Sequence, residues 1–162
     1  MQQINVVHDF PGISPDRWFE IYLDDGFNEE LERRLDVKSR KVLESKQDGD
    51  IVRRRVKMEP NVPGMFQKFV KDGMSIEEQS TVYLDRHHVD WTTIPSMGGD
   101  KFKSSGTLEV AAQGDGCRRT LKGTVEVKIP LMGKKIEKKI LETIHQSYEI
   151  ATALMKDWHA RQ

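Results

Sequence analysis

One arginine of this sequence falls within a run of apolar residues that alternate along the chain. Val52, Val56 and Met58 share one face of a strand-like segment, and the same alternation places Arg54 on that face. A guanidinium group among apolar side chains must be paired or must reach water. Arg54 could therefore hold the polar end of a ligand in an apolar pocket. The alternative is that Arg54 lies at the sheet edge, or that a bulge reverses the alternation, and that the face is ordinary core.

Other polar or aromatic side chains share a face with apolar residues further along the chain. Ser80 alternates with Val82, and Ser104 alternates with Leu108. Ordinary core packing is again the alternative to a pocket. The ligand-cavity residues that we predict are Arg54, Ser80, Trp91, Ser104, Leu108 and Tyr148.

The residue patterns that usually carry catalysis or metal binding are absent from the sequence. It has no G-x-S-x-G elbow, no Walker loop and no H-E-x-x-H motif. His87 and His88 would project to opposite sides of an extended chain, and the other histidines lack ligand spacing. Cys117 begins a strand-like segment and is expected to be structural. We predict no catalytic residue, no metal site and no cofactor.

A cluster of lysines begins the C-terminal helix on the side away from its apolar residues. Such a patch could touch anionic lipid head groups beside a cavity, which would give a weak contact with an anionic membrane surface. The preferred interpretation is a solvated helix face, because Glu137 and Glu142 offer local pairs. The lysines are Lys134, Lys135, Lys138 and Lys139.

Composition indicates one soluble domain over residues 1–162. Basic and acidic residues number 26 each, and this balance argues against a general nucleic-acid binder. The single cysteine allows no internal disulfide and favours a reducing compartment. The sequence shows no signal peptide and no apolar run of transmembrane length. We therefore expect a cytoplasmic protein and make no prediction of its oligomeric state.

The C-terminal part of the chain changes from a strand period to a helix period. Alternating Val125, Val127 and Ile129 predict a strand that Pro130 ends. After Gly133, apolar residues recur every three or four positions, which predicts one helix of roughly 40 Å. These helix positions are Ile136, Ile140, Ile144, Tyr148, Ala151, Met155 and Trp158.

The rest of the chain predicts a first strand, two short helices and a long antiparallel meander. Ser14 is expected to cap the first helix, Gly26 to break it, and Asn28 to cap a second helix over 29–35. Asp48-Gly49-Asp50 is a good hairpin turn. The predicted strands are Ile4–Phe10, Val37–Gln47, Ile51–Met58, Ile76–Leu84, Val89–Ile94, Phe102–Val110 and Cys117–Ile129.

The segment from Asn61 to Gly73 is too apolar for an idle solvated loop. Its Pro and Gly ends would flank a lid over a pocket mouth, formed by Met65, Phe66 and Phe69. The alternative is an insert that simply caps the core.

This order of elements resembles the helix-grip fold of the START-like, or SRPBCC, superfamily. The run GTVEVKIPLMGKKIEKKI, preceded by SSGTLEV and a Gly-Asp-Gly turn, is similar to the C-terminal half of a bacterial START-like family of unknown function. It has a weaker similarity to the lipid-binding VASt domains. The resemblance implies an α+β fold in which a curved antiparallel sheet of six to seven strands wraps around the last helix. It also implies a cavity for a hydrophobic ligand, and it carries over no catalytic residue.

Three functions follow as hypotheses. The first is a binding module for a lipid or an aromatic, polyketide-like metabolite. The second is a cyclase-like or aromatase-like enzyme, for which Arg54, Tyr83, His88 and Tyr148 are the available polar groups; an inward carboxylate or histidine facing Arg54 would favour it. The third is a regulatory module that binds a protein partner without a ligand, which a filled core would favour.

Overall fold

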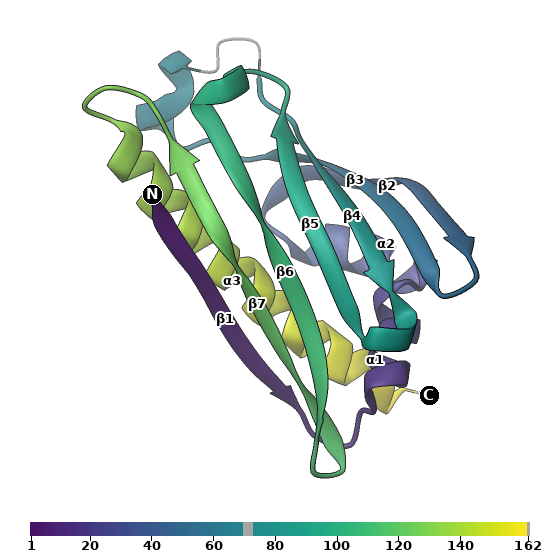
Figure 1. The fold of residues 1–162 in the computed structure, drawn as a ribbon. Coiled ribbons are helices and arrows are strands. Elements are labelled where there is room, and N and C mark those ends of the chain that lie inside the picture. The colour runs from purple at the N-terminus through teal and green to yellow at the C-terminus, as the bar shows by residue number, and fades with distance from the viewer. Residues whose placement is uncertain (70–72, 162) are drawn as a thin grey trace.

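The computed structural model describes residues 1–69 and 73–161, except for the side chain of Phe69. Seven strands form one antiparallel sheet in the order β1-β7-β6-β5-β4-β3-β2, and α3 lies along one face of it (Figure 1). This arrangement confirms the predicted helix-grip architecture. The elements are β1 (Gln2–Phe10), α1 (Pro15–Tyr22), α2 (Asp25–Arg34), β2 (Val37–Asp48), β3 (Ile51–Pro60), η1 (Gly64–Phe69), β4 (Ile76–Tyr83), η2 (Leu84–Arg86), β5 (His88–Pro95), η3 (Gly99–Lys101), β6 (Phe102–Gln113), β7 (Gly116–Val127) and α3 (Gly133–Ala160).

The two short helices begin at side-chain caps. Ser14 Oγ accepts the N–H of Arg17 at 3.1 Å, which confirms the predicted cap of α1. The predicted boundaries of the second helix were wrong. Asp24 caps α2 through the N–H of Phe27, so Gly26 and Asn28 both lie inside the helix.

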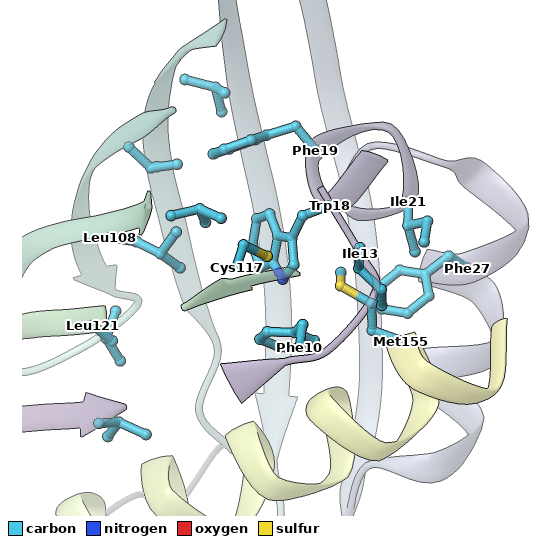
Figure 2. Close-up of a cluster of buried hydrophobic side chains, with 14 of the residues drawn as sticks. Phe10, Ile13, Trp18, Phe19, Ile21, Phe27, Leu108, Cys117, Leu121 and Met155 are labelled. Atoms are coloured by element: carbon cyan, nitrogen blue, oxygen red, sulfur yellow. The ribbon is translucent and has the colours of Figure 1, made fainter. Parts of the chain in front are cut away.

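The core fills the end of the molecule where α1 and the C-terminal half of α3 meet the sheet. Trp18 contacts Phe10 and Phe19 with ring centroids 6.2 and 4.9 Å apart, and Met155 of α3 closes the cluster (Figure 2). Leu154 is completely buried. Within the predicted apolar stripe of α3, Met155 is buried. The stripe residues that pack against the core and stay partly exposed are Ile140, Ile144, Tyr148, Ala151 and Trp158.

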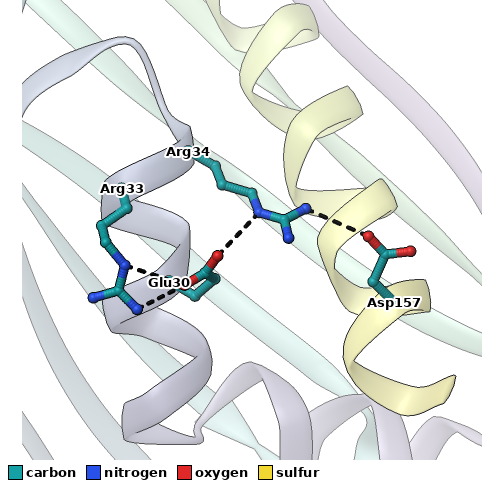
Figure 3. Close-up of polar contacts among 4 residues, drawn as sticks. All are labelled: Glu30, Arg33, Arg34 and Asp157. Atoms are coloured by element: carbon teal, nitrogen blue, oxygen red, sulfur yellow. Dashed lines mark hydrogen bonds and ion pairs between the residues drawn. The ribbon is translucent and has the colours of Figure 1, made fainter. Parts of the chain in front are cut away.

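Ion pairs on the surface tie α2 to α3. Glu30 accepts from Arg33 and Arg34, and Arg34 also reaches Asp157 of α3 at 3.4 Å (Figure 3). Exposed pairs of this kind contribute at most about 1 kcal/mol each. The position of α2 therefore depends mainly on its buried side chains, Phe27, Asn28 and Leu31.

Within the described residues, no helix combines the length and the apolar character that crossing a membrane would require.

Candidate functional site

The inner face of the sheet is closed at one end and accessible at the other. Val52, Val82 and Val89 are buried at the end near α1. On the same strands, the inward side chains further from α1 keep part of their surface exposed. α3 packs most closely on β1 and β7, so it leaves these middle strands partly uncovered. The partly exposed residues include Met58, Ile76, Trp91 and Phe102 on the sheet, and Ile140, Ile144 and Tyr148 on α3.

Three of the predicted cavity residues lie in one row across the sheet. Arg54 on β3 pairs with Ser80 on β4, and Ser80 pairs with Trp91 on β5. Arg54 is only 2% exposed and points inward, as the alternation predicted. Arg54 Nε, Ser80 Oγ and Trp91 Nε1 are buried atoms without a hydrogen-bond partner in residues 1–69 and 73–161. The row therefore carries unused polar atoms.

The other predicted cavity residues occupy different environments. Ser104 is buried beside the row, opposite Thr93 on β5. Leu108 lies in the closed core cluster. Tyr148 is partly exposed on α3, and burial of its hydroxyl raises its pKa, so the group stays protonated and can donate a hydrogen bond.

Asn28 accepts hydrogen bonds from two arginines beside the inner face of the sheet. Arg40 Nη1 and Arg54 Nη2 donate to Asn28 Oδ1 at 2.9 and 3.0 Å. The amide nitrogen of Asn28 donates to the carbonyl oxygens of Tyr22 and Asp24, which fixes the orientation of the side chain. The Arg54 guanidinium also lies over the Tyr22 ring at 4.6 Å. A short polar side chain inside α2 therefore holds two cations together.

Glu78 is an inward-facing carboxylate two residues from Ser80 of this row. It shares the inner face with Ser80 and Val82, and it lies opposite Val56 on β3. Its charge influences Arg40, Tyr22 and Tyr148 without a hydrogen bond or ion pair to any described residue. An inward carboxylate near Arg54 is the feature that favours the enzyme hypothesis.

Arg119 is a second buried cation, on β7 beside α3. Its Nη2 donates to His8 Nδ1 at 2.6 Å and to Thr152 Oγ1 at 2.9 Å. Because Nδ1 accepts this bond, the neutral His8 ring carries its hydrogen on Nε2, which lies 2.8 Å from Glu149. Burial lowers the pKa of Arg119 to about 10, so the group is still charged at neutral pH.

The absence of a side chain at Gly123 makes room for the indole of Trp91. Gly106 pairs with Trp91 on one side and with Gly123 of β7 on the other. A Cβ at Gly123 would lie 2.8 Å from Cζ2 of Trp91 and would also meet the carbonyl oxygen of Ser105. The indole therefore reaches across β6 over bare backbone.

We expect Gly123→Ala to lower the free energy of unfolding by about 1–3 kcal/mol, because the methyl group overpacks this contact. Urea unfolding measures the loss, and tryptophan fluorescence should shift as Trp91 is displaced. Gly64→Ala is the matched control, because a Cβ there meets no atom of the described residues within 4 Å. Equal stability of the two variants would contradict the proposed role of Gly123.

The predicted lid is only partly packed. Phe66 is 8% exposed, whereas Met65 is 68% exposed. The Phe69 side chain, also assigned to the lid, lies outside the described residues. The segment borders a hollow of about 440 Å³ lined in part by Lys38, Asn61 and Gln67. A second hollow of about 570 Å³ lies at the start of α3, and the six predicted cavity residues line neither of the two.

The remaining sequence candidates have ordinary surface or core surroundings. His87 lies 2.6 Å from Asp16, and His88 lies 2.7 Å from Asp90, so the adjacent histidines face different partners. The lysines at the start of α3 are exposed, and Lys139 lies 3.7 Å from Glu142.

Cys117 is buried in the core, and burial raises the pKa of its thiol to about 11. The native state therefore keeps a proton that the unfolded chain releases near pH 9, so stability falls as pH rises from 9 to 11. We expect titration of this thiol to lower the free energy of unfolding by on the order of 2 kcal/mol over this pH range. Urea unfolding at pH 8 and pH 11 should show the stability gap between wild type and Cys117→Ala shrinking by that amount. An unchanged gap would contradict it.

The sequence-based predictions missed five polar residues on or beside the inner face of the sheet. Arg119 alternates with Cys117 and Leu121, and Glu78 alternates with Ser80, so the strand period held a signal for both. The other three gave no such signal. The missed residues are Tyr22, Asn28, Arg40, Glu78 and Arg119.

Solved structures with a similar fold cover nearly the whole chain. TTHA0849 from Thermus thermophilus has a TM-score of 0.67 at 16% identity, over 96% of this chain and 95% of that one. A START superfamily protein from Mycobacterium smegmatis has a TM-score of 0.57 at 16% identity, over 96% and 94%. The di-domain ARO/CYC StfQ from the steffimycin biosynthetic pathway has 0.59 at 7% identity, over 99% of this chain and 46% of that one. These similarities confirm the predicted START-like fold.

No curated protein matches this sequence. A family model does match, and it covers residues 5–158, which is most of the chain. The chain therefore belongs to the family described as Protein of unknown function (DUF2505).

Proposed function

We propose that this protein binds a hydrophobic small molecule between the inner face of its sheet and α3. The observation that carries the proposal is the difference in burial along that face. Inward apolar side chains such as Trp91, Phe102 and Ile144 stay partly exposed, although the same face is fully packed near α1. Covering such surface stabilises a complex by about 25 cal/mol per Å², before the costs of association.

The surrounding chemistry suits an amphiphilic ligand such as a lipid or an aromatic metabolite. Apolar side chains from β3–β6 and α3 would hold its body, and the row of Arg54, Ser80 and Trp91 offers a few polar atoms to orient it. The segment that begins at Asn61 would serve as the lid of this space; Phe66 in it is buried, and Asn61 and Val62 line a hollow of their own.

Filling the space tests the proposal. Thr93 faces inward and its hydroxyl donates to the carbonyl oxygen of Ser104, whereas its neighbour Ile94 is 47% exposed on the outer face. We expect Thr93→Trp to weaken uptake of Nile red, a neutral apolar dye, at least tenfold. Ile94→Trp, the matched control, should change it less than twofold. Thermal melting would show that both variants fold.

Native mass spectrometry of the purified protein gives the second readout, because a co-purified ligand would appear as added mass. If the wild type carries no small molecule and takes up no Nile red, the proposal fails. It also fails if Thr93→Trp binds the dye as tightly as the wild type does.

Glu78 favours one second candidate, an enzyme that moves protons on a bound substrate. Its carboxylate lies on the inner face without a hydrogen bond or ion pair in the described chain, so it could exchange a proton with a bound substrate. StfQ is a di-domain ARO/CYC with this fold, and its 7% identity gives a likeness of fold alone. Conversion of a polyketide-like substrate by the wild type, lost in Glu78→Gln while dye uptake persists, would establish this candidate.

A further inference from the structure

Two arginines of the inner wall share a single neutral acceptor. Arg40 and Arg54 both donate to Asn28 Oδ1, and Arg54 Nε has no partner among the described residues. A guanidinium group has five N–H donors, and the other contact of Arg54 within the described residues, Tyr22, is also uncharged. Two cations that converge on one uncharged atom lack a counter-charge.

The neighbouring carboxylates do not supply that counter-charge directly. Glu78 faces the same space but forms no ion pair with Arg40 or Arg54 in the part of the chain that the structure describes. Glu32 accepts the backbone N–H of Arg40 and binds the Lys41 ammonium group, so its charge is engaged there. Even with Glu78 counted, the two guanidinium groups leave a net positive charge at the wall.

Burial makes this imbalance significant. Arg54 is only 2% exposed, and a buried cation without a paired anion is costly. Burial, and then the charge of Arg54, lower the pKa of Arg40. An anion bound to these two guanidinium groups would offset the cost of the buried charge and raise the pKa of Arg40.

Three residues at this site keep part of their surface exposed. They are Arg40, Tyr22 and Tyr148, whereas Arg54 is buried. The Tyr148 hydroxyl remains protonated and can add a donor. Guanidinium groups match the planar fork of a carboxylate and also bind phosphate oxygens in pairs.

We infer that the bound hydrophobic molecule carries an acidic head group, a carboxylate or a phosphate monoester, that Arg40 and Arg54 recognise. This inference rests on the proposed function and specifies its ligand class. The apolar chain of the ligand would extend along Trp91 and the exposed side of α3, with the head group at the Asn28 wall.

Four ten-carbon probes test the inference in calorimetric titrations of the whole protein: decanoate, decyl phosphate, decanol and decyltrimethylammonium. We expect one or both acidic probes to bind at least tenfold tighter than decanol, and the ammonium probe to bind weakest. The stronger of the two acidic probes identifies the head group. Arg54→Met and Arg40→Met should each remove most of this preference and leave decanol binding within about twofold.

The control is Arg33→Met, which removes an exposed arginine of α2 paired with Glu30. It should keep the acidic preference, and circular dichroism would verify the fold of all three variants. If decanol binds as tightly as both acidic probes, or if both arginine variants keep the preference, the inference is overturned and the proposed function stands. If decanol and the acidic probes all fail to bind, the proposed function fails with it.

Discussion

Trp18→Ala should lower the free energy of unfolding by about 3–5 kcal/mol, a large share of the 5–15 kcal/mol typical of a domain. Trp18 is 1% exposed, and its ring contacts Phe10, Phe19 and Tyr22 at centroid distances of 6.2, 4.9 and 5.0 Å. Removing it leaves a cavity where α1 joins the sheet. Urea unfolding measures the loss, and the melting temperature should fall by about 6–20 °C.

Two further variants separate packing from polarity at this position. Trp18→Phe should cost only about 1 kcal/mol, because it keeps much of the ring volume and removes a buried Nε1–H that has no partner within the described chain. Met65→Ala is the exposed control and should change stability by less than about 0.5 kcal/mol. A loss below about 1 kcal/mol for Trp18→Ala would mean that α1 does not anchor the core.

The sequence predicted the elements whose apolar period is long and uninterrupted. The apolar stripe of α3 contacts the core from Ile140 to Trp158, and the period of two along the strands places Arg54 on the inner face of the sheet. In both cases many residues agree on one face, so a single exception does not change the prediction.

Local cap signals were less reliable because two candidates compete. Asp24 and Asn28 lie four residues apart, and both types cap helices. Tertiary contacts decide between them. Asn28 is needed inside the helix by Arg40 and Arg54, and Gly26 is needed there because a Cβ would lie 3.2 Å from the Trp158 ring.

The pairing of Arg40 with Arg54 could not be predicted either, because it also depends on tertiary contacts. β2 has register irregularities between Val37 and Ser39 and between Val42 and Glu44, so alternation along it does not say which side Arg40 faces. Its partner Asn28 comes from another element, and no spacing in the sequence joins the two.

Replacing Arg119 should have the second large effect on the free energy of unfolding. Whether stability rises or falls depends on the residue that replaces it. Burial lowers the pKa of Arg119 from its ordinary value to about 10, so the native state gives up the proton before the unfolded chain does. Its contribution to stability therefore rises as the pH rises above about 10, and at lower pH the buried charge opposes folding. The bonds to His8 and Thr152, and the Tyr148 ring at 4.7 Å, offset part of this cost.

We expect Arg119→Met at pH 7 to be as stable as the wild type or more stable, by up to about 4 kcal/mol, because it keeps volume and removes the charge. Arg119→Ala should be about 2–4 kcal/mol less stable than Arg119→Met, because it leaves a cavity. Urea unfolding of both variants measures the difference. Arg118→Met is the matched control, since Arg118 is the exposed neighbour paired with Asp9, and it should change stability by less than about 1 kcal/mol.

The comparison decides what the buried charge does. If Arg119→Met loses as much stability as Arg119→Ala, the hydrogen bonds to His8 and Thr152 hold α3 and β1 to the sheet, and the prediction is wrong. If Arg119→Met is stable, the fold does not require the charge. Arg119 and the Arg40–Arg54 pair would then make the inner face positively charged at a cost to folding, as expected of a surface built to attract an anionic ligand.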